Sequence, residues 1–230
     1  MDRDAAKKAT GQEAAALVRD GMALGLGTGS TTAYALKAIG QRVRNEGLDV
    51  RGVPTSFAAE RLAQKHGIPL TTLDDDPILD LAIDGADEVD DDMRLIKGRG
   101  GAHAREKVVA TQAERFVVVV DPTKEVNQLG TDHPLPVEVL PMATTPISNI
   151  LSKQGARPEL RVADAKDGPV VTDQGLWIVD AHFPGGIDDP DALNQVLNAR
   201  PGVLDHGLFL DLATDVIVGH TDGTTTHRTP

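Results

Sequence analysis

The sequence contains no cysteine and few aromatic residues: one Trp, one Tyr and four Phe among 230 residues. The absence of cysteine excludes disulfide bonds and thiolate chemistry. So few aromatic rings leave little surface on which bases could stack, which argues against a platform for single-stranded nucleic acid. The seven histidines show no spacing typical of metal ligands, so we expect no metal site.

Long apolar runs are also absent. No segment approaches the roughly 20 consecutive apolar residues that a membrane-spanning helix needs. The first residues, Met1-Asp2-Arg3-Asp4, contain no apolar signal region. We therefore expect a cytoplasmic protein with no membrane partner. A hydrophobic content of 40% is enough for one sizeable globular unit or two small domains.

Basic residues are outnumbered, because 23 Lys and Arg stand against 35 Asp and Glu, which gives a net charge of −12. A surface of this sign repels a phosphate backbone, so we expect no nucleic-acid partner. A local basic pocket is compatible with this balance. Acidic clusters such as Asp74–Asp76 and Asp90–Asp92 indicate a charged surface suited to salty surroundings.

The run GLGTGSTT, residues 25–32, is the most informative local motif. Its glycines let the backbone turn tightly and bring N–H groups close to an anion, and Thr28, Ser30 and Thr31 add hydroxyl donors. The helix expected to follow directs its N-terminal dipole to the same place. The run lacks both the lysine of a Walker loop and the third glycine of the dinucleotide fingerprint. A phosphate-binding loop is favoured over a purely structural turn.

Two acids follow the apolar run 78–83, which is typical of a buried strand. Asp84 and Asp87 flank a Gly-Ala pair and would lie at the carboxyl end of that strand, where open α/β sheets bind ligands. Carboxylates at this edge can bind sugar hydroxyls or exchange protons with them. A solvated acidic turn is the alternative, and we prefer it for residues 90–92.

A third segment, LIKGRGGAHAREKVVA at 95–110, combines a lysine, a glycine-rich loop and a helix that carries a glutamate. Such a loop can bring Lys97 and Glu106 to one pocket. A carboxylate in a partly desolvated cleft has a raised pKa and becomes a general base, and a nearby ammonium stabilises an oxyanion. The alternative makes Glu106 and Lys107 ordinary exposed helix residues.

Four motifs in this order, GLGTGSTTAYAL, DGADEVD, LIKGRGGAHAREKVVA and VVDPTKEV, resemble those of the type A ribose-5-phosphate isomerase family. The resemblance covers nearly the whole chain, because 135–142 and 199–203 are also similar to family segments. It implies an aldose-ketose isomerase of the pentose phosphate pathway that interconverts D-ribose 5-phosphate and D-ribulose 5-phosphate. It further implies proton transfer between C2 and C1 through a cis-enediolate, without metal or organic cofactor. The implied partners are a phosphorylated pentose and further copies of the chain, in a homodimer or homotetramer.

The resemblance assigns site residues one by one. Glu106 matches the proton acceptor, and Asp84, Asp87 and Lys97 are the other catalytic candidates. Lys124, in the motif VVDPTKEV, matches a lysine that binds substrate. The substrate-binding residues that it implies are Thr28, Gly29, Ser30, Thr31, Asp84, Gly85, Ala86, Asp87, Lys97, Gly98, Arg99, Gly100 and Lys124.

Two residues of the third motif depart from the common family pattern. Arg99 stands where a glycine is frequent, and it could add a second phosphate-binding cation or point to solvent. His103 occupies a usually aliphatic position, and we expect a packed or exposed bystander rather than a proton carrier, despite the suitable pKa of an imidazole.

Two other functions fit parts of the pattern. A sugar-phosphate sensor of the kind fused to repressors shares the phosphate loop but does not need Glu106 or Lys97. We see no stretch before Gly25 for a helix-turn-helix domain and no basic face, so we rank this function lower. Another enzyme of the same fold, an amino-sugar phosphate deaminase or an acyl-CoA transferase, would need other catalytic residues.

The pattern of elements predicts an α/β protein with two domains. Helix and strand patterns alternate to about residue 130, as expected for a Rossmann-like parallel-sheet domain. We predict a helix over 4–19 and strands over 22–26, 50–54 and 116–120.

After residue 132 the order β-α-β-β-α-β predicts a smaller ferredoxin-like α+β domain, with a hairpin over 170–180 and a helix over 190–198. Residues 207–212 and 215–219 are expected to return to the first domain as paired strands, and the tail after 222 to be frayed. The predicted domains are 1–131 plus 207–230, and 132–206.

The acidic excess predicts higher stability and activity in molar KCl than at low salt. At about 1 M salt the Debye length is only about 3 Å, so repulsion among surface carboxylates is screened. We expect the melting temperature and the rate of ribose 5-phosphate isomerisation to rise on addition of KCl. If both stay constant or fall, adaptation to high salt is contradicted.

Overall fold

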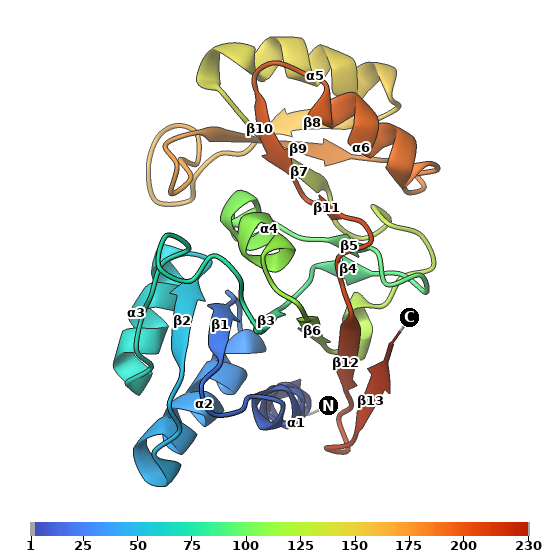
Figure 1. The fold of residues 1–230 in the computed structure, drawn as a ribbon. Helices are drawn as coiled ribbons and strands as arrows, with labels where there is room; N and C mark the ends of the chain where they lie inside the picture. Colours follow the sequence, from blue (N-terminus) through green and yellow to red (C-terminus); the bar gives the residue numbers. More distant parts are fainter. Residues whose placement is uncertain (1–2, 230) are drawn as a thin grey trace. The chain divides into compact units, whose positions relative to one another are not determined.

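The computed structural model describes residues 3–229 of the chain, which divides into two compact units (Figure 1). Each unit is assembled from segments that are distant in the sequence. Unit 1 comprises Met1–Ala86, Arg105–Glu125 and Asp211–Pro230, and unit 2 comprises Asp87–Ala104 and Val126–Leu210.

Unit 1 is built on a six-stranded sheet with the order β13-β12-β6-β3-β1-β2. The strands from β12 to β2 run parallel to their neighbours, and β13 pairs antiparallel with β12 at one edge. The predicted α/β class with a parallel sheet is thereby confirmed. The strands are Ala23–Leu26 (β1), Arg51–Pro54 (β2), Leu81–Asp84 (β3), Phe116–Val120 (β6), Asp215–Gly219 (β12) and Thr225–Arg228 (β13).

Helices provide the crossovers that parallel strands require. Apolar side chains recur on one face of the second helix, so that Leu36 and Ile39 pack with the strand residues Leu26 and Ile83 in the main core. All five residues of β6 are buried, as its continuous apolar run predicts. The helical elements are α1 (Arg3–Ala16), α2 (Thr32–Glu46), α3 (Phe57–His66), α4 (His103–Thr111), which unit 1 includes from Arg105 onward, and the 3-10 turn η1 (Pro122–Lys124).

Unit 2 contains a four-stranded antiparallel sheet with the order β10-β7-β9-β8. Two helices pack on it through Ile147, Leu151, Leu193 and Leu197. Along the chain the order is β7-α5-β8-β9-α6-β10, the β-α-β-β-α-β succession predicted from the sequence. The bounds are Leu135–Val139 (β7), Pro141–Ala143 (the 3-10 turn η2), Thr144–Lys153 (α5), Arg157–Leu160 (β8), Trp177–His182 (β9), Pro190–Asn198 (α6) and Val203–His206 (β10).

A second, three-stranded sheet in unit 2 has the order β11-β5-β4, formed by Leu208–Phe209, Leu95–Ile96 and Glu88–Val89. The expectation that residues 207–212 return to the parallel sheet is therefore wrong, because β11 pairs with β5 in unit 2. Strands of two residues are too short to show a period in the sequence. The segment 215–219 does join the parallel sheet, next to β6.

The predicted domains divide the chain at other positions than the observed units. Residues 87–104 and 126–131, placed in the first domain from the sequence, group with unit 2. Pairing of β5 with β4 and β11, and of the Val126 N–H with the Val89 carbonyl at 2.9 Å, holds these segments there. The domain boundaries themselves stay a prediction.

The sequence predicts a hairpin over 170–180, but its first half, residues 170–176, forms no strand that pairs with β9. A tight turn does occur, since the Gly175 N–H donates to the Thr172 carbonyl at 2.9 Å. The strand that follows, β9, pairs along its length with β7 and with β8. Pairing partners more distant in the sequence thus replace the local one.

The tail after Asp222 is not frayed as expected, because β13 pairs with β12 over four residues. Side chains reinforce this edge strand: the Thr225 hydroxyl donates to Glu13, and Arg228 forms an ion pair with Glu125 at 3.1 Å. Threonine also favours strand conformation. The polar residues after Asp222 therefore belong to an ordered edge strand, β13, and do not indicate a frayed tail.

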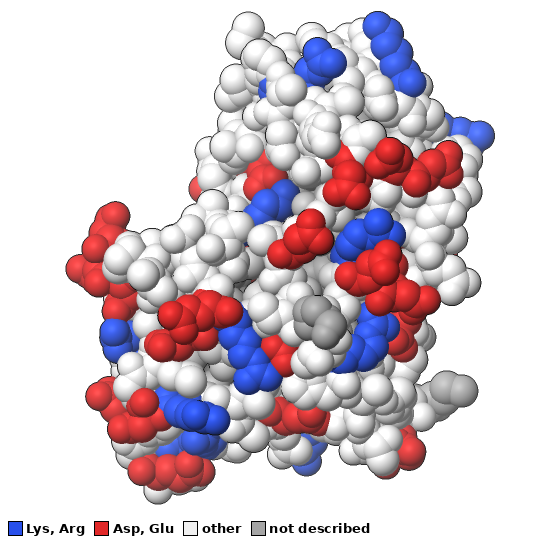
Figure 2. All heavy atoms as spheres, turned by 45° about the vertical axis from the view of Figure 1, so that its right-hand side comes forward, with Lys and Arg blue, Asp and Glu red and all other residues white. Residues whose placement is uncertain are grey.

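Acidic and basic side chains are interspersed on the face that Figure 2 shows. Asp and Glu residues are spread over this face, and Lys and Arg residues lie singly or in small groups between them, without a continuous basic area among the residues coloured there. None of the described helices has the length and apolar character that crossing a bilayer requires.

A buried carboxylate fastens the end of the chain to the sheet of unit 1. Asp215, with a side chain that is 3% exposed, accepts hydrogen bonds from Arg115 at 2.6 and 2.7 Å, and it also contacts Thr214 and His227 at 2.7 Å. Burial alone would raise the pKa of Asp215, but the hydrogen bonds from Arg115, Thr214 and His227 outweigh it and lower that pKa to about 2.

This low pKa predicts a pH-dependent loss of stability in Asp215→Asn. The folded-state pKa lies below the reference value of 3.8, so the carboxylate stabilises the folded state above pH 4, and this contribution is lost as the pH falls toward 2. We expect the variant to lose about 2 kcal/mol of unfolding free energy at pH 7 in urea titrations, and roughly half of that at pH 3. An equal difference at both pH values would contradict the assignment.

Candidate active site

A tight turn that contains Gly29 connects β1 to α2. Gly29 has φ of +126°, a conformation that residues with a side chain rarely adopt. The Thr28 side chain forms hydrogen bonds with the hydroxyls of Thr55 at 3.0 Å and Ser56 at 2.6 Å. Ser30 is exposed and Thr31 half-buried. The N–H groups of Ala33 and Tyr34, at the start of α2, donate to the carbonyls of Gly29 and Thr31 at 3.0 Å each. The dipole of α2 and the side chains of Ser30 and Thr31 are therefore what this turn can present to an anion.

Asp84 connects the end of β3 to this loop. Its side chain is buried, and Oδ1 accepts hydrogen bonds from the Thr28 N–H at 2.9 Å and the Gly85 N–H at 2.8 Å. Gly27 leaves the necessary space, because a Cβ there would lie 2.3 Å from the Asp84 Cγ. The carboxylate thus fixes the conformation of the loop in addition to any contact with a ligand.

Glu106 and Lys124 belong to the same unit as this loop. Glu106 lies in the first turn of α4 and is only 7% exposed, so the alternative of an ordinary exposed helix residue is wrong. Lys124 ends the 3-10 turn η1 directly after β6, and Asp121 caps this turn by accepting from the Thr123 N–H at 3.0 Å. Since β1, β3 and β6 are parallel neighbours, Thr28, Asp84 and Lys124 follow the carboxyl ends of adjacent strands.

Unit 2 holds the remaining predicted residues in one short loop. Lys97 follows β5, is 3% exposed, and places its ammonium 5.5 Å from the centre of the Phe209 ring. The loop turns back at once, since the Gly101 N–H donates to the Gly98 carbonyl at 2.9 Å. The carboxylate of Asp87 also holds this loop, because it accepts a hydrogen bond from the Arg99 N–H at 2.9 Å. Asp87, Lys97, Gly98, Arg99 and Gly100 are therefore brought together within unit 2.

The two departures from the family pattern have different environments. The Arg99 side chain is exposed, as either a phosphate-binding cation or a solvent-facing residue would be, so its role stays a prediction. His103 is fully buried, with Nε2 at 4.0 Å from Oε2 of Glu138. Burial raises the pKa of Glu138, although a hydrogen bond from Thr172 at 2.5 Å opposes the shift. His103 is thus packed and not exposed, and its being a bystander to the reaction stays a prediction.

Sequence reasoning missed the buried carboxylate of Glu88, which lies next to Asp87. It accepts hydrogen bonds from the N–H groups of Gly130 at 2.5 Å, Asp132 at 2.8 Å and His133 at 2.6 Å. Only its position within the motif DGADEVD could have indicated it. Among residues 3–229 no group of three or more His, Asp or Glu side chains is placed to hold a metal ion.

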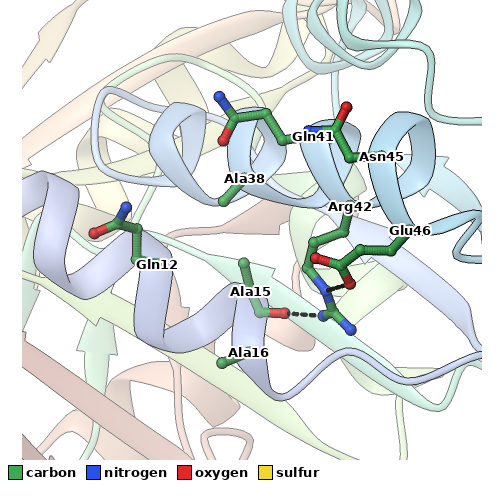
Figure 3. A pocket seen from close by; sticks show the side chains of 8 residues that line it. All are labelled: Gln12, Ala15, Ala16, Ala38, Gln41, Arg42, Asn45 and Glu46. Atoms are coloured by element: carbon green, nitrogen blue, oxygen red, sulfur yellow. Dashed lines mark hydrogen bonds and ion pairs between the residues drawn. The ribbon is translucent and has the colours of Figure 1, made fainter.

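A hollow of about 450 Å³ between α1 and α2 contains none of these residues (Figure 3). Arg42 lines it, and its guanidinium donates to the carbonyls of Ala15 at 2.7 Å and Val18 at 2.8 Å and to Glu46 at 3.1 Å. These bonds tie the end of α1 to α2, so the polar groups of the hollow serve the packing of two helices.

Comparison with known proteins identifies the family. Residues 51–223 match the sequence model of ribose 5-phosphate isomerase A (phosphoriboisomerase A). The chain is 55% identical over 222 residues to ribose-5-phosphate isomerase A of Haloarcula marismortui, which covers 96% of this chain and 95% of the relative. It is 51% identical over 214 residues to ribose-5-phosphate isomerase A of Trichormus variabilis, with 93% and 90% covered.

Solved structures agree with this assignment. Ribose 5-phosphate isomerase A from Methanocaldococcus jannaschii matches with a TM-score of 0.94 at 43% identity, and a D-ribose-5-phosphate isomerase in complex with phospho-erythronic acid with 0.96 at 44%. Both matches cover 100% of each chain. Because sequence, motif order and fold agree over nearly the whole length, the chain belongs to the ribose 5-phosphate isomerase A family.

Proposed function

We propose that this chain interconverts D-ribose 5-phosphate and D-ribulose 5-phosphate, with Glu106 as the base that moves a proton between C2 and C1. The observation that carries the proposal is a nearly buried carboxylate, 7% exposed, in the first turn of the helix that follows the Lys97–Gly101 loop, within a chain of this family. The relative bound to phospho-erythronic acid supports it, because that ligand combines a phosphate with a negatively charged sugar-acid end.

The phosphate of the substrate is assigned to the loop Thr28–Thr31 and to Lys124. The dipole of α2, which begins at Thr32, and the hydroxyls of Ser30 and Thr31 favour an anion here. The ammonium of Lys124 adds a positive charge in a chain of net charge −12. Binding energy from this remote group holds the pentose while chemistry proceeds at C1 and C2.

Proton transfer then needs one base and one site for negative charge. Glu106 removes the proton from C2, and the C–H bond electrons form the C1=C2 bond of the cis-enediolate with negative charge on O1. The hydroxyl proton passes from O2 to O1, and the same carboxyl returns the carbon proton to C1 as the C2 carbonyl forms. The Lys97 ammonium and the N–H groups of the Gly98–Gly100 segment stabilise the charge that develops on oxygen, more strongly where water is excluded. Asp84 and Lys97 assist opening of the sugar ring, and Asp87 binds a sugar hydroxyl.

This transfer moves a proton within one molecule, so the proposed steps involve no electron carrier. A homodimer or homotetramer as the assembled form, and the cytoplasm as the place of action, stay predictions from the sequence and the family resemblance.

The role of Glu106 predicts that Glu106→Gln has almost no turnover but still binds the sugar phosphate. The amide is isosteric but cannot accept the C2 proton, so we expect kcat to fall by at least about 1,000-fold. Binding of ribose 5-phosphate, measured by calorimetry, should stay within about three-fold of the wild type because the phosphate contacts are intact.

Glu114→Gln is the matched control, since it removes the same charge from an exposed side chain shortly after α4. It should retain the activity of the wild type. Near-normal turnover in Glu106→Gln would exclude this residue as the base, and an inactive wild type would exclude the proposed reaction.

The position of Asp84 predicts that Gly27→Ala loses both stability and substrate binding. The new Cβ would lie 2.4 Å from Asp84 Oδ1 and from the Ile83 carbonyl oxygen, so the carboxylate that holds the loop must move. We expect a loss of about 1–3 kcal/mol in urea unfolding, as for other overpacked sites, together with a higher KM for ribose 5-phosphate.

Gly85→Ala is the control for stability, because its nearest neighbour would lie at 3.7 Å, an ordinary contact. The prediction fails if Gly27→Ala and Gly85→Ala unfold at the same urea concentration.

A further inference from the structure

One guanidinium in unit 2 contacts both a strand and the backbone of the loop that follows Lys97. Arg161, the residue after β8, donates from Nε and Nη2 to the two carboxylate oxygens of Asp180 on β9, at 2.7 and 2.5 Å. Its Nη1 donates to the carbonyl oxygens of Gly98 and Arg99, each at 3.0 Å. The side chains of Arg161 and Asp180 are only 16% and 15% exposed, so water competes weakly for these bonds.

The loop needs such an anchor because of its composition. Three of its four residues from 98 to 101 are glycines, and Gly98 and Gly101 have φ of +104° and +73°. A glycine-rich backbone loses more conformational entropy on ordering than any other, so its native shape depends on bonds from outside. Asp87 holds the Arg99 N–H, and Arg161 holds the two carbonyls.

The orientation of one peptide plane follows from these bonds. In a trans peptide the C=O and the N–H point in opposite directions. With the Arg99 carbonyl held by Arg161, the Gly100 N–H is directed away from the guanidinium. Gly100 is exposed, and no described residue accepts a hydrogen bond from this N–H. The donor is therefore aimed outward from the loop and is available to a ligand.

We propose that Arg161, fixed by Asp180, is a positioning residue for the isomerase: it sets the peptide planes of residues 98–100 so that the Gly100 N–H and the Lys97 ammonium meet the oxyanion of the enediolate. The inference rests on the proposed function for its chemistry, and on four hydrogen bonds within unit 2 for its geometry. An arginine is required, because an ammonium cannot hold a carboxylate in a bidentate manner and two carbonyls in fixed directions at once.

The kinetic test compares Arg161→Met with Arg161→Lys and with a control four residues earlier in the chain, Arg157→Met. Arg157 begins β8, is exposed, and its loss removes the same charge. We expect kcat of Arg161→Met to fall by about ten-fold or more, because misplacing a donor by a fraction of an ångström weakens transition-state contacts. KM should change by less than about three-fold, since the phosphate loop is unaltered.

Arg161→Lys should recover part of the lost kcat, and Arg157→Met should stay within about two-fold of the wild type. If kcat of Arg161→Met equals that of Arg157→Met, the positioning role is overturned. A rise in KM at unchanged kcat would overturn it too, because it would show a loss of uniform binding instead of transition-state stabilisation.

Hydrogen–deuterium exchange of the full-length protein tests the geometry without turnover. In Arg161→Met, amides of the segment 98–102 should exchange about ten-fold faster or more, while those of β9 keep their wild-type protection. Equal loss of protection in β9 would show a merely structural role, and unchanged exchange in the loop would refute the anchor. This measurement stays decisive even if the wild type proves inactive on ribose 5-phosphate, so failure of the proposed function is distinguishable.

Discussion

The carboxylate of Asp84 is the contact on which the loop between β1 and α2 depends. It stands at the end of β3 and accepts hydrogen bonds from the N–H groups of Thr28 and Gly85, so two adjacent strand ends share one acceptor. Such charge-assisted bonds are shorter and stronger than neutral ones, and they are most effective where water is excluded. The shape of the loop is therefore set by a residue more than fifty positions away, and its glycines supply the space and the φ values.

In unit 2, too, charged side chains hold the backbone of loops in place. Its irregular segments are held by carboxylates and a guanidinium and only to a small extent by regular pairing: Glu88 holds the segment 130–133, Asp87 holds the Arg99 N–H, and the pair of Arg161 and Asp180 holds the carbonyls at 98–99. Loss of one partner leaves a buried group unsatisfied, which costs about 1–3 kcal/mol or more for a charged group. Rigid loops thus need no large hydrophobic contact of their own.

Much of this architecture could be predicted from the sequence, because it follows from local patterns. The apolar run 116–120 forms β6 and the amphipathic pattern 190–198 forms α6, each within the predicted bounds. Residue types and spacing also indicated the candidate site residues, because they restrict the possible chemistry. These residues are the glycine-rich run 25–32, the acids Asp84 and Asp87, and Lys97 before the second glycine-rich loop. Their assignment to an isomerase required the resemblance of four ordered motifs.

Other parts could not be predicted, since they depend on contacts between distant residues. Leu208–Phe209 is too short to reveal its partner, and the polar strand 225–228 is ordered by Glu13, Glu125 and Asp215, which its own composition does not show. Arg161 lies more than sixty residues from the carbonyls it holds. An arginine directly after a half-buried strand looks the same in sequence whether it faces solvent or a loop.

The late position of β12 and β13 has a consequence for biosynthesis. Both strands belong to the sheet of unit 1, yet the chain reaches them only after every residue of unit 2 has been made. About a hundred residues are translated between strand β6 and strand β12, its neighbour in the sheet. On the ribosome, unit 2 can complete its own sheets while the parallel sheet still has an unprotected edge. Because the order of the strands along the chain leaves this edge of the sheet open during synthesis, the edge must be protected from pairing with other chains until β12 has been made.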